Sequence, residues 1–419
     1  IDRTNRFQQA NVFLNSGVLN AGDLIERSGE EPEGDSGSTD YYTTYNLTGH
    51  FNTGLFQHTV LLGGDYYQNQ NDPGKGVGFT IPPIDVFQPI HDANRTIQYT
   101  YDDSGESQDW FGFYLQDQVK LPFDVHVLAG FRYDHASTST DITVTDFSAG
   151  LGQTSKIQEQ REDEAVTPRF GLVWRPLPEL SLYGNYVENF GANNGSDENR
   201  KPLPPQTAQQ WELGMKTELF NGRLTGSVAW FDLTKQNVPR PNPENPLFSI
   251  ATGEVRHQGL ELDLAGEILP NWRTVASYTY LDSEVTKDSA QEFDEQGNVN
   301  GVNAGSTGNR IAGTPRHMAS LWTTYEIGEG QLSGLKFGAG VVARSQNFAD
   351  QTNNDLRIPG YAIVNALTSF EWMVGKSKLT AQLNVDNLFD KTYFANSGSG
   401  ITAFYGTPRT FMGSMRVEF

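Results

Sequence analysis

The stretch DWFGFYLQDQVKL at residues 109–121 alternates large apolar side chains with polar or small ones. In an extended chain, successive side chains point to opposite faces. One face then carries Phe111, Phe113, Leu115, Val119 and Leu121. The opposite face carries Gly112, Tyr114, Gln116, Gln118 and Lys120. An alternation with a period of two predicts a β-strand with one apolar and one polar face.

The same period recurs in GLELDLAGEIL at 259–269 and in KLTAQLNVDNL at 378–388. These segments are long, whereas strands of globular proteins cluster at about five or six residues. Ten residues at about 3.3 Å each, tilted by about 45°, cover roughly 23 Å, close to the apolar band of an outer-membrane barrel. A propeller packs four short strands into about 40 residues, whereas here two long strands and one loop take about 50. Strand length therefore favours a barrel.

Short turns alternate with long polar connections along the chain. The short connections contain Gly, Pro or Asn, which suit tight hairpins, and they lie at 52–57, 121–124, 176–180, 220–223, 269–272, 328–334 and 374–377. The long polar stretches include 15–40, 71–95 and 287–310. We therefore expect an all-β fold, a transmembrane antiparallel up-and-down β-barrel with turns at one end and loops at the other. Counting back from Phe419 gives about 16 strands, the first a partial strand near residues 1–14.

Composition excludes several classes of function. The formal net charge of −21 over 419 residues argues against a nucleic-acid partner, whose phosphates demand a basic surface. The absence of cysteine excludes disulfides and thiolate metal sites. The sequence has no run of about 18 apolar residues, so it offers no candidate for a transmembrane helix. The wall of a barrel, by contrast, needs only every second residue to be apolar. The histidines lack zinc-site spacing, and we expect no cofactor, no resident metal and no catalytic residue.

The last strand ends on an aromatic residue. In TFMGSMRVEF at 410–419, one register carries Phe411, Met415, Val417 and Phe419. Terminal residues are usually poorly ordered unless they are tied down. We interpret these four residues as the lipid-facing side of a closing strand and as a membrane-insertion signal that the barrel assembly machinery reads. The alternative is a sheet edge that happens to end in Phe.

Several motifs together resemble the C-terminal part of TonB-dependent siderophore receptors. They are QTAQQWELGMKTELFNGRLTGSVAWFDLTKQNV (206–238), GEVRHQGLELDLAGEILPNW (253–272), GNRIAGTPRHMASLWTTYE (308–326), NVDNLFDKTYF (384–394) and FYGTPRTFMGSMRVEF (404–419). The resemblance is close over residues 200–419 and extends to the rest by pattern. It implies a barrel of 22 strands around an N-terminal plug that takes up ferric siderophores across the outer membrane of a Gram-negative type of bacterium.

The chain also departs from that family. Counted against 22 strands, it looks like strands seven to 22, with about six strands, the plug and the TonB box missing. We therefore expect residues 1–419 to be the C-terminal part of the barrel domain. The resemblance implies that the TonB–ExbB–ExbD complex acts through the missing plug. Outer-membrane lipid and lipopolysaccharide are the other expected partners.

Ligand-binding candidates are aromatic and cationic residues near the loop ends of the strands. Aromatic side chains suit the apolar parts of a siderophore, and cations suit an anionic ferric complex. The candidates are Tyr186, Phe190, Phe231, Arg240, Phe348, Phe404 and Tyr405. The alternative is the aromatic girdle that barrels carry whatever their cargo.

Two further motifs carry polar residues in the expected wall. Glu212 and Lys216, in PQTAQQWELGMK, share the polar face and could pair with each other or with a plug. Such residues are more often structural than ligand contacts. In NLFD at 387–390, Asn387 and Asp390 are expected within a long strand, where their side chains could bond inside the wall.

Two other functions compete with siderophore uptake. A plug-less passive porin or nutrient channel would fit an even strand count without a plug. A membrane-embedded hydrolase would need a Ser–His pair within hydrogen-bond reach, and nothing in the sequence selects one serine from the rest.

Overall fold

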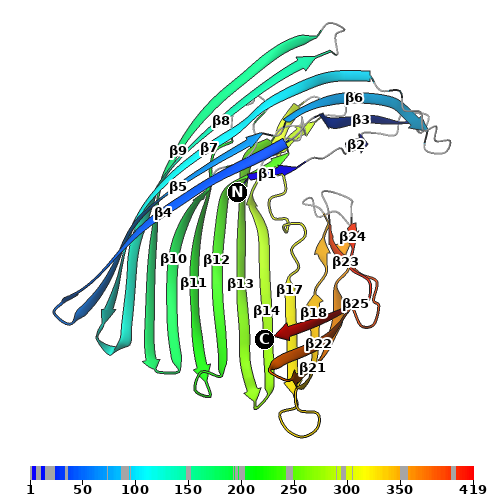
Figure 1. The fold of residues 1–419 in the computed structure, drawn as a ribbon. Helices are drawn as coiled ribbons and strands as arrows, with labels where there is room; N and C mark the ends of the chain where they lie inside the picture. Colours follow the sequence, from blue (N-terminus) through cyan, green and yellow to red (C-terminus); the bar gives the residue numbers. More distant parts are fainter. Residues whose placement is uncertain are drawn as a thin grey trace. The chain divides into compact units, whose positions relative to one another are not determined.

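The computed structural model describes residues 2–5, 11–14, 24–33, 36–72, 74–85, 94, 96–147, 152–191, 193, 197, 203–241, 249–288, 290–293, 299–303, 305–349, 357–397 and 403–419. Most of them lie in β-strands (Figure 1). One 3₁₀ turn, η1, spans Pro122–Asp124. Within these ranges, no helix is long and apolar enough to cross a membrane. The expected all-β antiparallel fold is confirmed.

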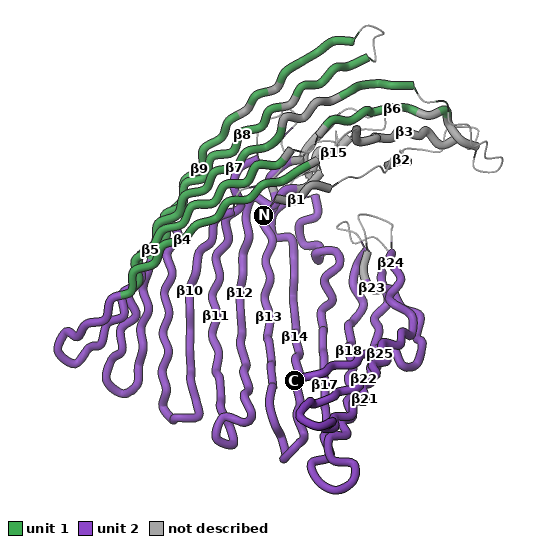
Figure 2. The backbone as a smooth tube through the Cα atoms, in the orientation of Figure 1, with its two compact units in different colours: residues 1–48, 61–115, 131–166 green, residues 49–60, 116–130, 167–419 purple. Residues whose placement is uncertain are grey.

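The chain divides into two compact units, coloured separately in Figure 2. Unit 1 comprises residues 1–48, 61–115 and 131–166, and unit 2 comprises residues 49–60, 116–130 and 167–419. The strands of the first half are β1 (Asp2–Asn5), β2 (Asn11–Leu14), β3 (Leu24–Glu33), β4 (Ser36–Thr53), β5 (Phe56–Asp72), β6 (Gly74–Asp85), β7 (Thr96–Leu121), β8 (Val125–Asp146) and β9 (Gln153–Leu177). By these bounds, β4, β5, β7, β8 and β9 contribute residues to both units.

Unit 2 contains an antiparallel meander of consecutive strands (Figure 1). The strands are β10 (Leu180–Gly191), β11 (Gln206–Leu219), β12 (Leu224–Pro241), β13 (Ser249–Leu269), β14 (Trp272–Lys287), β17 (His317–Glu326), β18 (Leu335–Arg344), β21 (Tyr361–Val374), β22 (Ser377–Asp386) and β25 (Thr410–Glu418). Each strand pairs with the next one in this series. The up-and-down order predicted for this part of the chain is therefore present.

The two faces of this meander differ in polarity. On β11, Trp211, Leu213 and Met215 are exposed on one face, while Gln210 and Glu212 lie on the other. The apolar face continues through the register partners Trp230, Leu260 and Tyr280 on the next strands. Exposed apolar surface costs about 25 cal/mol per Å² in water. This face is therefore stable only against an apolar environment such as lipid.

Tight turns close the ends of neighbouring strands. Between β11 and β12, Phe220, Asn221 and Gly222 have φ angles of 54°, 57° and 80°. Asn271 and Gly375 also have positive φ, at 63° and 65°. Asn and Gly tolerate this left-handed conformation at low cost, which explains why they mark the short connections. We call this end of the unit 2 strands the turn end and the opposite end the loop end.

Several long connections contain strands of their own, which the sequence analysis did not predict. Hairpins form between β15 (Ala290–Phe293) and β16 (Val299–Asn303), β19 (Asn347–Phe348) and β20 (Arg357–Ile358), and β23 (Phe394–Ser397) and β24 (Ala403–Tyr405). In unit 1, β3 and β6 pair with each other, although the sequence analysis assigned them to the polar connections 15–40 and 71–95. Where the sequence predicts one partial strand near residues 1–14, the described ranges 2–5 and 11–14 form two short strands, β1 and β2.

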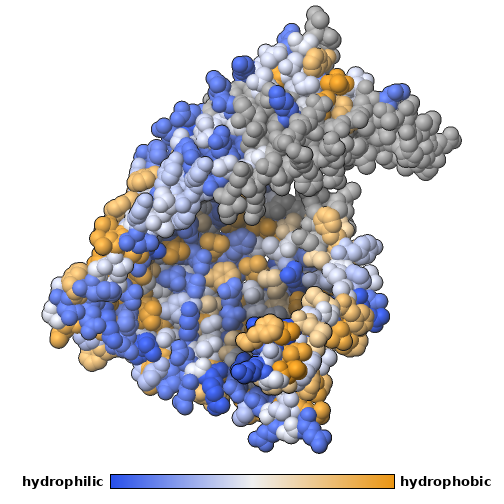
Figure 3. All heavy atoms as spheres, in the orientation of Figure 1, coloured by the Kyte–Doolittle hydropathy of each residue, from blue (hydrophilic) through white to orange (hydrophobic). Residues whose placement is uncertain are grey.

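The terminal strand β25 pairs with β22 along its whole length. Phe411, Met415 and Val417 are 64%, 73% and 45% exposed, and their register partners are Val385, Ala381 and Leu379. Phe419 follows the strand and is fully exposed. Hydrophobic side chains gather over this region of unit 2 in Figure 3. The expected apolar register of the last strand is thus present, while its role as an insertion signal stays a prediction.

Candidate functional site

The polar face of unit 2 carries a hollow between β8, β9, β10 and β11. It has a volume of about 440 Å³, and its lining includes His126, Asn185, Tyr183, Glu212 and Lys216. The Tyr183 hydroxyl donates a 2.7 Å hydrogen bond to Glu212. The Lys216 ammonium lies 5.2 Å from the centroid of the Tyr183 ring. Glu212 and Lys216 therefore both contact Tyr183, and no direct ion pair joins them.

Phe231 lies next to this hollow on the same face. Phe231 is on β12, and its register partners are Glu212 on β11 and Gly259 on β13. A Cβ atom added to Gly259 would come within 2.6 Å of the Phe231 ring, so the ring occupies the space that the missing side chain leaves. Phe231 therefore lies on the polar face of this wall, opposite Glu212.

Tyr186 and Phe190 lie on the apolar face of the wall, opposite to the face that carries Phe231. Tyr186 pairs with Trp211 in register, and their ring centroids are 4.6 Å apart. Trp211 is 56% exposed on the apolar face, so Tyr186 shares that face, with its hydroxyl donating to Glu188 at 2.5 Å. Phe190, four residues further along β10, has the same parity. Arg240 lies in β12, but its side chain is outside the described residues.

The loop end of unit 2 brings three candidates into neighbouring hairpins. Phe348 and Arg357 are register partners in the β19–β20 hairpin, and the Arg357 guanidinium carbon lies 4.9 Å from the Phe348 ring centroid. In the β23–β24 hairpin, the rings of Phe394 and Tyr405 are 4.9 Å apart. Strands β20 and β23 lie in contact. Phe404 and Tyr405 are 55% and 72% exposed.

A second aromatic pair connects these hairpins to the wall. The rings of Tyr361, at the start of β21, and Tyr393, just before β23, are 4.4 Å apart. Tyr361 is the register partner of Arg344, and directly paired residues project from the same face of a sheet. We call the six residues Phe348, Arg357, Tyr361, Tyr393, Phe394 and Tyr405 the loop cluster. The sequence analysis identified Phe348 and Tyr405 but missed the other four, because their proximity depends on hairpins that it did not predict.

The NLFD motif anchors the connection that carries β23 and β24. Asn387 is 2% exposed, and its side-chain amide donates to the carbonyls of Lys391 and Thr407 at 2.9 and 3.1 Å. Its side-chain oxygen accepts a bond from the Lys391 backbone at 2.9 Å. Asp390 accepts a 2.9 Å bond from the Arg409 backbone. The expectation that Asn387 and Asp390 lie within a strand is wrong, since β22 ends at Asp386 and both residues have positive φ.

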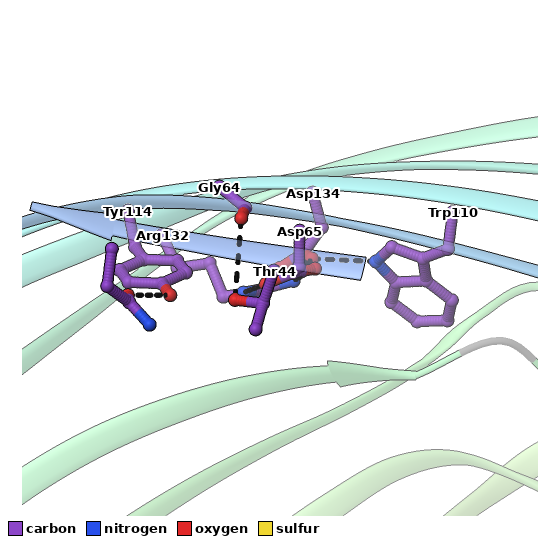
Figure 4. Close-up of polar contacts among 8 residues, drawn as sticks. Thr44, Gly64, Asp65, Trp110, Tyr114, Arg132 and Asp134 are labelled. Atoms are coloured by element: carbon purple, nitrogen blue, oxygen red, sulfur yellow. Dashed lines mark hydrogen bonds and ion pairs between the residues drawn. The ribbon is translucent and has the colours of Figure 1, made fainter. Parts of the chain in front are cut away.

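Unit 1 has a polar network of its own, drawn in Figure 4. Arg132 donates to both carboxylate oxygens of Asp65 at 2.6 and 2.8 Å and to both of Asp134 at 2.8 and 2.9 Å. The Trp110 indole also donates to Asp134, at 2.7 Å. The Arg132 guanidinium lies 5.6 Å from the Tyr114 ring centroid. Because these groups satisfy one another across β5, β7 and β8, we assign this network a structural role.

Among the residues that the structure describes, the hydroxyl of Ser283 lies within hydrogen-bond distance of the His257 ring. The Ser283 hydroxyl and His257 Nδ1 are 3.0 Å apart, but Ser283 is fully buried. A nucleophile without access cannot attack a substrate, so this pair does not make a hydrolase. The part of the chain that the structure describes contains no group of three His, Cys, Asp or Glu side chains that could hold a metal ion.

A sheet of long antiparallel strands with one apolar and one polar face defines the wall of an outer-membrane β-barrel. The chain belongs to the TonB-dependent receptor family. The model of the family described as "TonB dependent receptor-like, beta-barrel" matches residues 2–388 of this chain. Proteins of this family are transporters and receptors of the Gram-negative outer membrane, not enzymes.

Curated relatives match most of this chain. The metal-pseudopaline receptor CntO of Pseudomonas aeruginosa is 31% identical over 91% of this chain and 51% of its own length. The ferrioxamine B receptor of Salmonella typhimurium is 30% identical over 89% of this chain and 49% of its own length. The ferrichrome outer membrane transporter/phage receptor of Escherichia coli is 28% identical. The chain thus spans about half the length of these relatives.

Solved structures share the fold. The siderophore receptor PiuA of Acinetobacter baumannii superposes with a TM-score of 0.73 and 22% identity, over 97% of this chain and 60% of that one. BauA, the ferric preacinetobactin receptor of the same species, superposes with a TM-score of 0.70 and 20% identity, over 97% of this chain and 58% of that one. Both confirm the β-barrel fold class.

Proposed function

We propose that this chain is the C-terminal part of the barrel of an outer-membrane receptor that takes up ferric siderophores. The observation that carries the proposal is the family match over residues 2–388, together with relatives named as receptors for ferrioxamine B and ferrichrome. The two-faced wall of unit 2 supports it physically. An apolar face suits lipid, and a polar face suits an aqueous or protein-filled interior.

Transport energy and partners follow from the family. The complete receptor would be energised by the TonB–ExbB–ExbD complex through a plug, and the barrel would contact lipid and lipopolysaccharide. The exposed apolar register of β25 would be read by the barrel assembly machinery during insertion. Iron enters this account as part of the transported ligand, and no cofactor is required.

The ligand would be met by side chains at the loop end and on the polar face. Phe231 is the candidate on the wall, and Phe348, Phe404 and Tyr405 are the candidates in the hairpins. Tyr186 and Phe190 fit an aromatic girdle better, because Tyr186 packs on the exposed Trp211. Lys216 lies near the turn end of β11 and suits contact with a plug, whereas Glu212 lies at mid-strand, at the level of its register partner Phe231.

Uptake in cells tests the function. Deleting the gene that encodes this chain should abolish the uptake of one iron-55 siderophore in iron-limited cells, and a plasmid copy of the gene should restore it. Unchanged uptake of every siderophore tested would contradict the proposal. Stable, ion-selective channels from the purified chain in planar bilayers, with no uptake phenotype, would favour the passive porin instead.

A further inference from the structure

We propose that Asp117 and His58 form a site on the lipid-facing side of unit 2 that binds the ammonium group of a phospholipid headgroup. The two residues lie near the turn end of β7 and β5, strands that pair with each other, and both belong to unit 2. The inference goes beyond the proposed function, because it concerns the lipid around the wall and does not depend on the cargo.

Asp117 is a carboxylate within the apolar register of β7. The other residues of this register are Phe111, Phe113, Leu115, Val119 and Leu121. Strand β7 ends at Leu121, four residues after Asp117. At about 3.3 Å per residue and a tilt of about 45°, Asp117 lies roughly 9 Å from the turn end. This level is close to the border of the apolar band, where lipid headgroups meet acyl chains.

A chain of side-chain hydrogen bonds orients this carboxylate. His58 Nδ1 donates to Asp117 Oδ2 at 2.7 Å, since a carboxylate can only accept. In a neutral imidazole the other nitrogen is then an acceptor, and the Thr53 hydroxyl donates to His58 Nε2 at 2.7 Å. The ring of Phe51 stacks on His58, with centroids 4.8 Å apart and planes 6° from parallel. The imidazole is therefore held from three sides and fixes the position of Asp117.

Asp117 retains acceptor capacity that the chain does not use. A carboxylate has about four acceptor sites. In the part of the chain that the structure describes, Asp117 Oδ1 has no hydrogen-bond partner, and the ion pair of Asp117 is the one with His58. The Asp117 side chain is 35% exposed. Because the terminal torsion of Asp is broad, a small rotation of the carboxylate presents Oδ1 to a donor on the exposed side.

The environment of this face determines where the donor comes from. A carboxylate without a full set of donors is costly on a face that meets lipid. The exposed Phe51 continues the apolar surface beside it, so lipid is the neighbour on this side. The site combines a negative charge, a free acceptor and an aromatic ring, and all three favour a cationic donor.

Headgroup chemistry then selects the class of lipid. An ethanolamine headgroup carries a primary ammonium, which has N–H donors for Oδ1 and a charge opposite to that of Asp117. A choline headgroup carries the same positive charge but has no N–H group. A glycerol headgroup leaves the lipid with the net negative charge of its phosphate, which Asp117 repels. The site therefore distinguishes these headgroups by charge and by hydrogen bonding.

Native mass spectrometry of the full 419-residue chain in detergent tests the inference. The chain is titrated with dioleoyl lipids that carry ethanolamine, N,N-dimethylethanolamine, choline or glycerol headgroups. The dimethyl lipid keeps one N–H and should bind within about threefold of the ethanolamine lipid. Loss of that last N–H in the choline lipid should raise the Kd about tenfold, because a charge-assisted hydrogen bond is lost. The glycerol lipid should bind no better than the choline lipid.

A pair of variants assigns the preference to Asp117. Asp117→Asn removes the charge at nearly constant shape, so it should raise the Kd for the ethanolamine lipid about tenfold and leave the Kd for the choline lipid within about twofold. The matched control is Asp263→Asn. Asp263 lies on the polar face of β13, where it is the register partner of Ser227, and this change should leave both Kd values within about twofold. Circular dichroism of each variant checks that the strands form.

Three results would overturn the inference. Equal Kd values of the wild-type chain for the ethanolamine and choline lipids would mean unselective lipid contact only. An unchanged Kd of Asp117→Asn for the ethanolamine lipid, or an equal loss from Asp263→Asn, would remove Asp117 from the site. The headgroup series needs no variant, so it decides the question even if Asp117→Asn does not fold. Siderophore uptake that is lost on gene deletion, together with equal Kd values, would retain the proposed function and discard the lipid site.

Discussion

At the scale of single residues, Asn387 illustrates how one side chain can organise a connection. The residue is buried and lies just after β22, where its amide bonds both to the start and to the end of the segment that carries β23 and β24. An amide has donors and an acceptor in one group, which is why Asn suits this position. The β23–β24 hairpin, and with it Phe394 and Tyr405, depends on this anchor.

Replacing Asn387 tests the anchor. Asn387→Ala removes three side-chain hydrogen bonds, two of them to the carbonyls of Lys391 and Thr407, which should cost about 2–4 kcal/mol of the free energy of unfolding. Urea unfolding in detergent, followed by tryptophan fluorescence, measures the change. Asn52→Ala, at an exposed position of β4, should change the free energy of unfolding by less than about 0.5 kcal/mol. Equal effects of the two substitutions would show that Asn387 has no special role.

Residue parity separates the candidates on neighbouring strands once the strand registers are known. Tyr186 and Phe231 were both predicted as ligand contacts, yet they project from opposite faces. Trp211, the register partner of Tyr186, is exposed on the apolar face, whereas Glu212, the partner of Phe231, lies on the polar face. Strand registers were needed to relate these residues. Alternation within one strand does not reveal which residues of the next strand lie opposite.

At the scale of elements, the long alternating strands were predictable and the hairpins of the connections were not. Residues 259–269 alternate because one face is apolar over many residues, and that signal is local. The segments β19 and β20 are two residues each, too short for any period to be visible. Their pairing depends on backbone hydrogen bonds and on the contact between Phe348 and Arg357. A short polar sequence cannot reveal such a contact in advance.

The last strand offers a test of which face meets lipid. Met415→Arg places a charge among the exposed apolar residues of β25, which should cost about 2–4 kcal/mol at mid-bilayer depth. The folded fraction of the chain after insertion into lipid vesicles should fall. Ser414→Arg, one residue earlier and on the opposite face of the strand, is the matched control and should insert nearly as well as wild type. A larger loss for Ser414→Arg than for Met415→Arg would reverse the assignment of the faces.

At the scale of the whole molecule, the family assignment and the two-faced wall of unit 2 point to the same class of protein. The acidic composition and the absence of cysteine exclude several functions, but neither identifies the cargo. The family match supplies the class of transport, and the loop cluster supplies a hypothesis about where a ligand would be bound. Each part can fail without the other, because the wall depends on alternation along strands and the ligand site depends on connections between them.

The central claim is that the strands of unit 2 form a membrane wall with one lipid-facing and one polar face. Because the native chain contains no cysteine, single Cys residues can be introduced at each position from 210 to 215 of β11 and labelled with a fluorophore in lipid vesicles. A lipid-attached quencher should act on labels at 211, 213 and 215, and a water-soluble quencher on labels at 210, 212 and 214. Quenching that alternates in this way is the expected result, and equal quenching of all six positions by the water-soluble agent would contradict the claim.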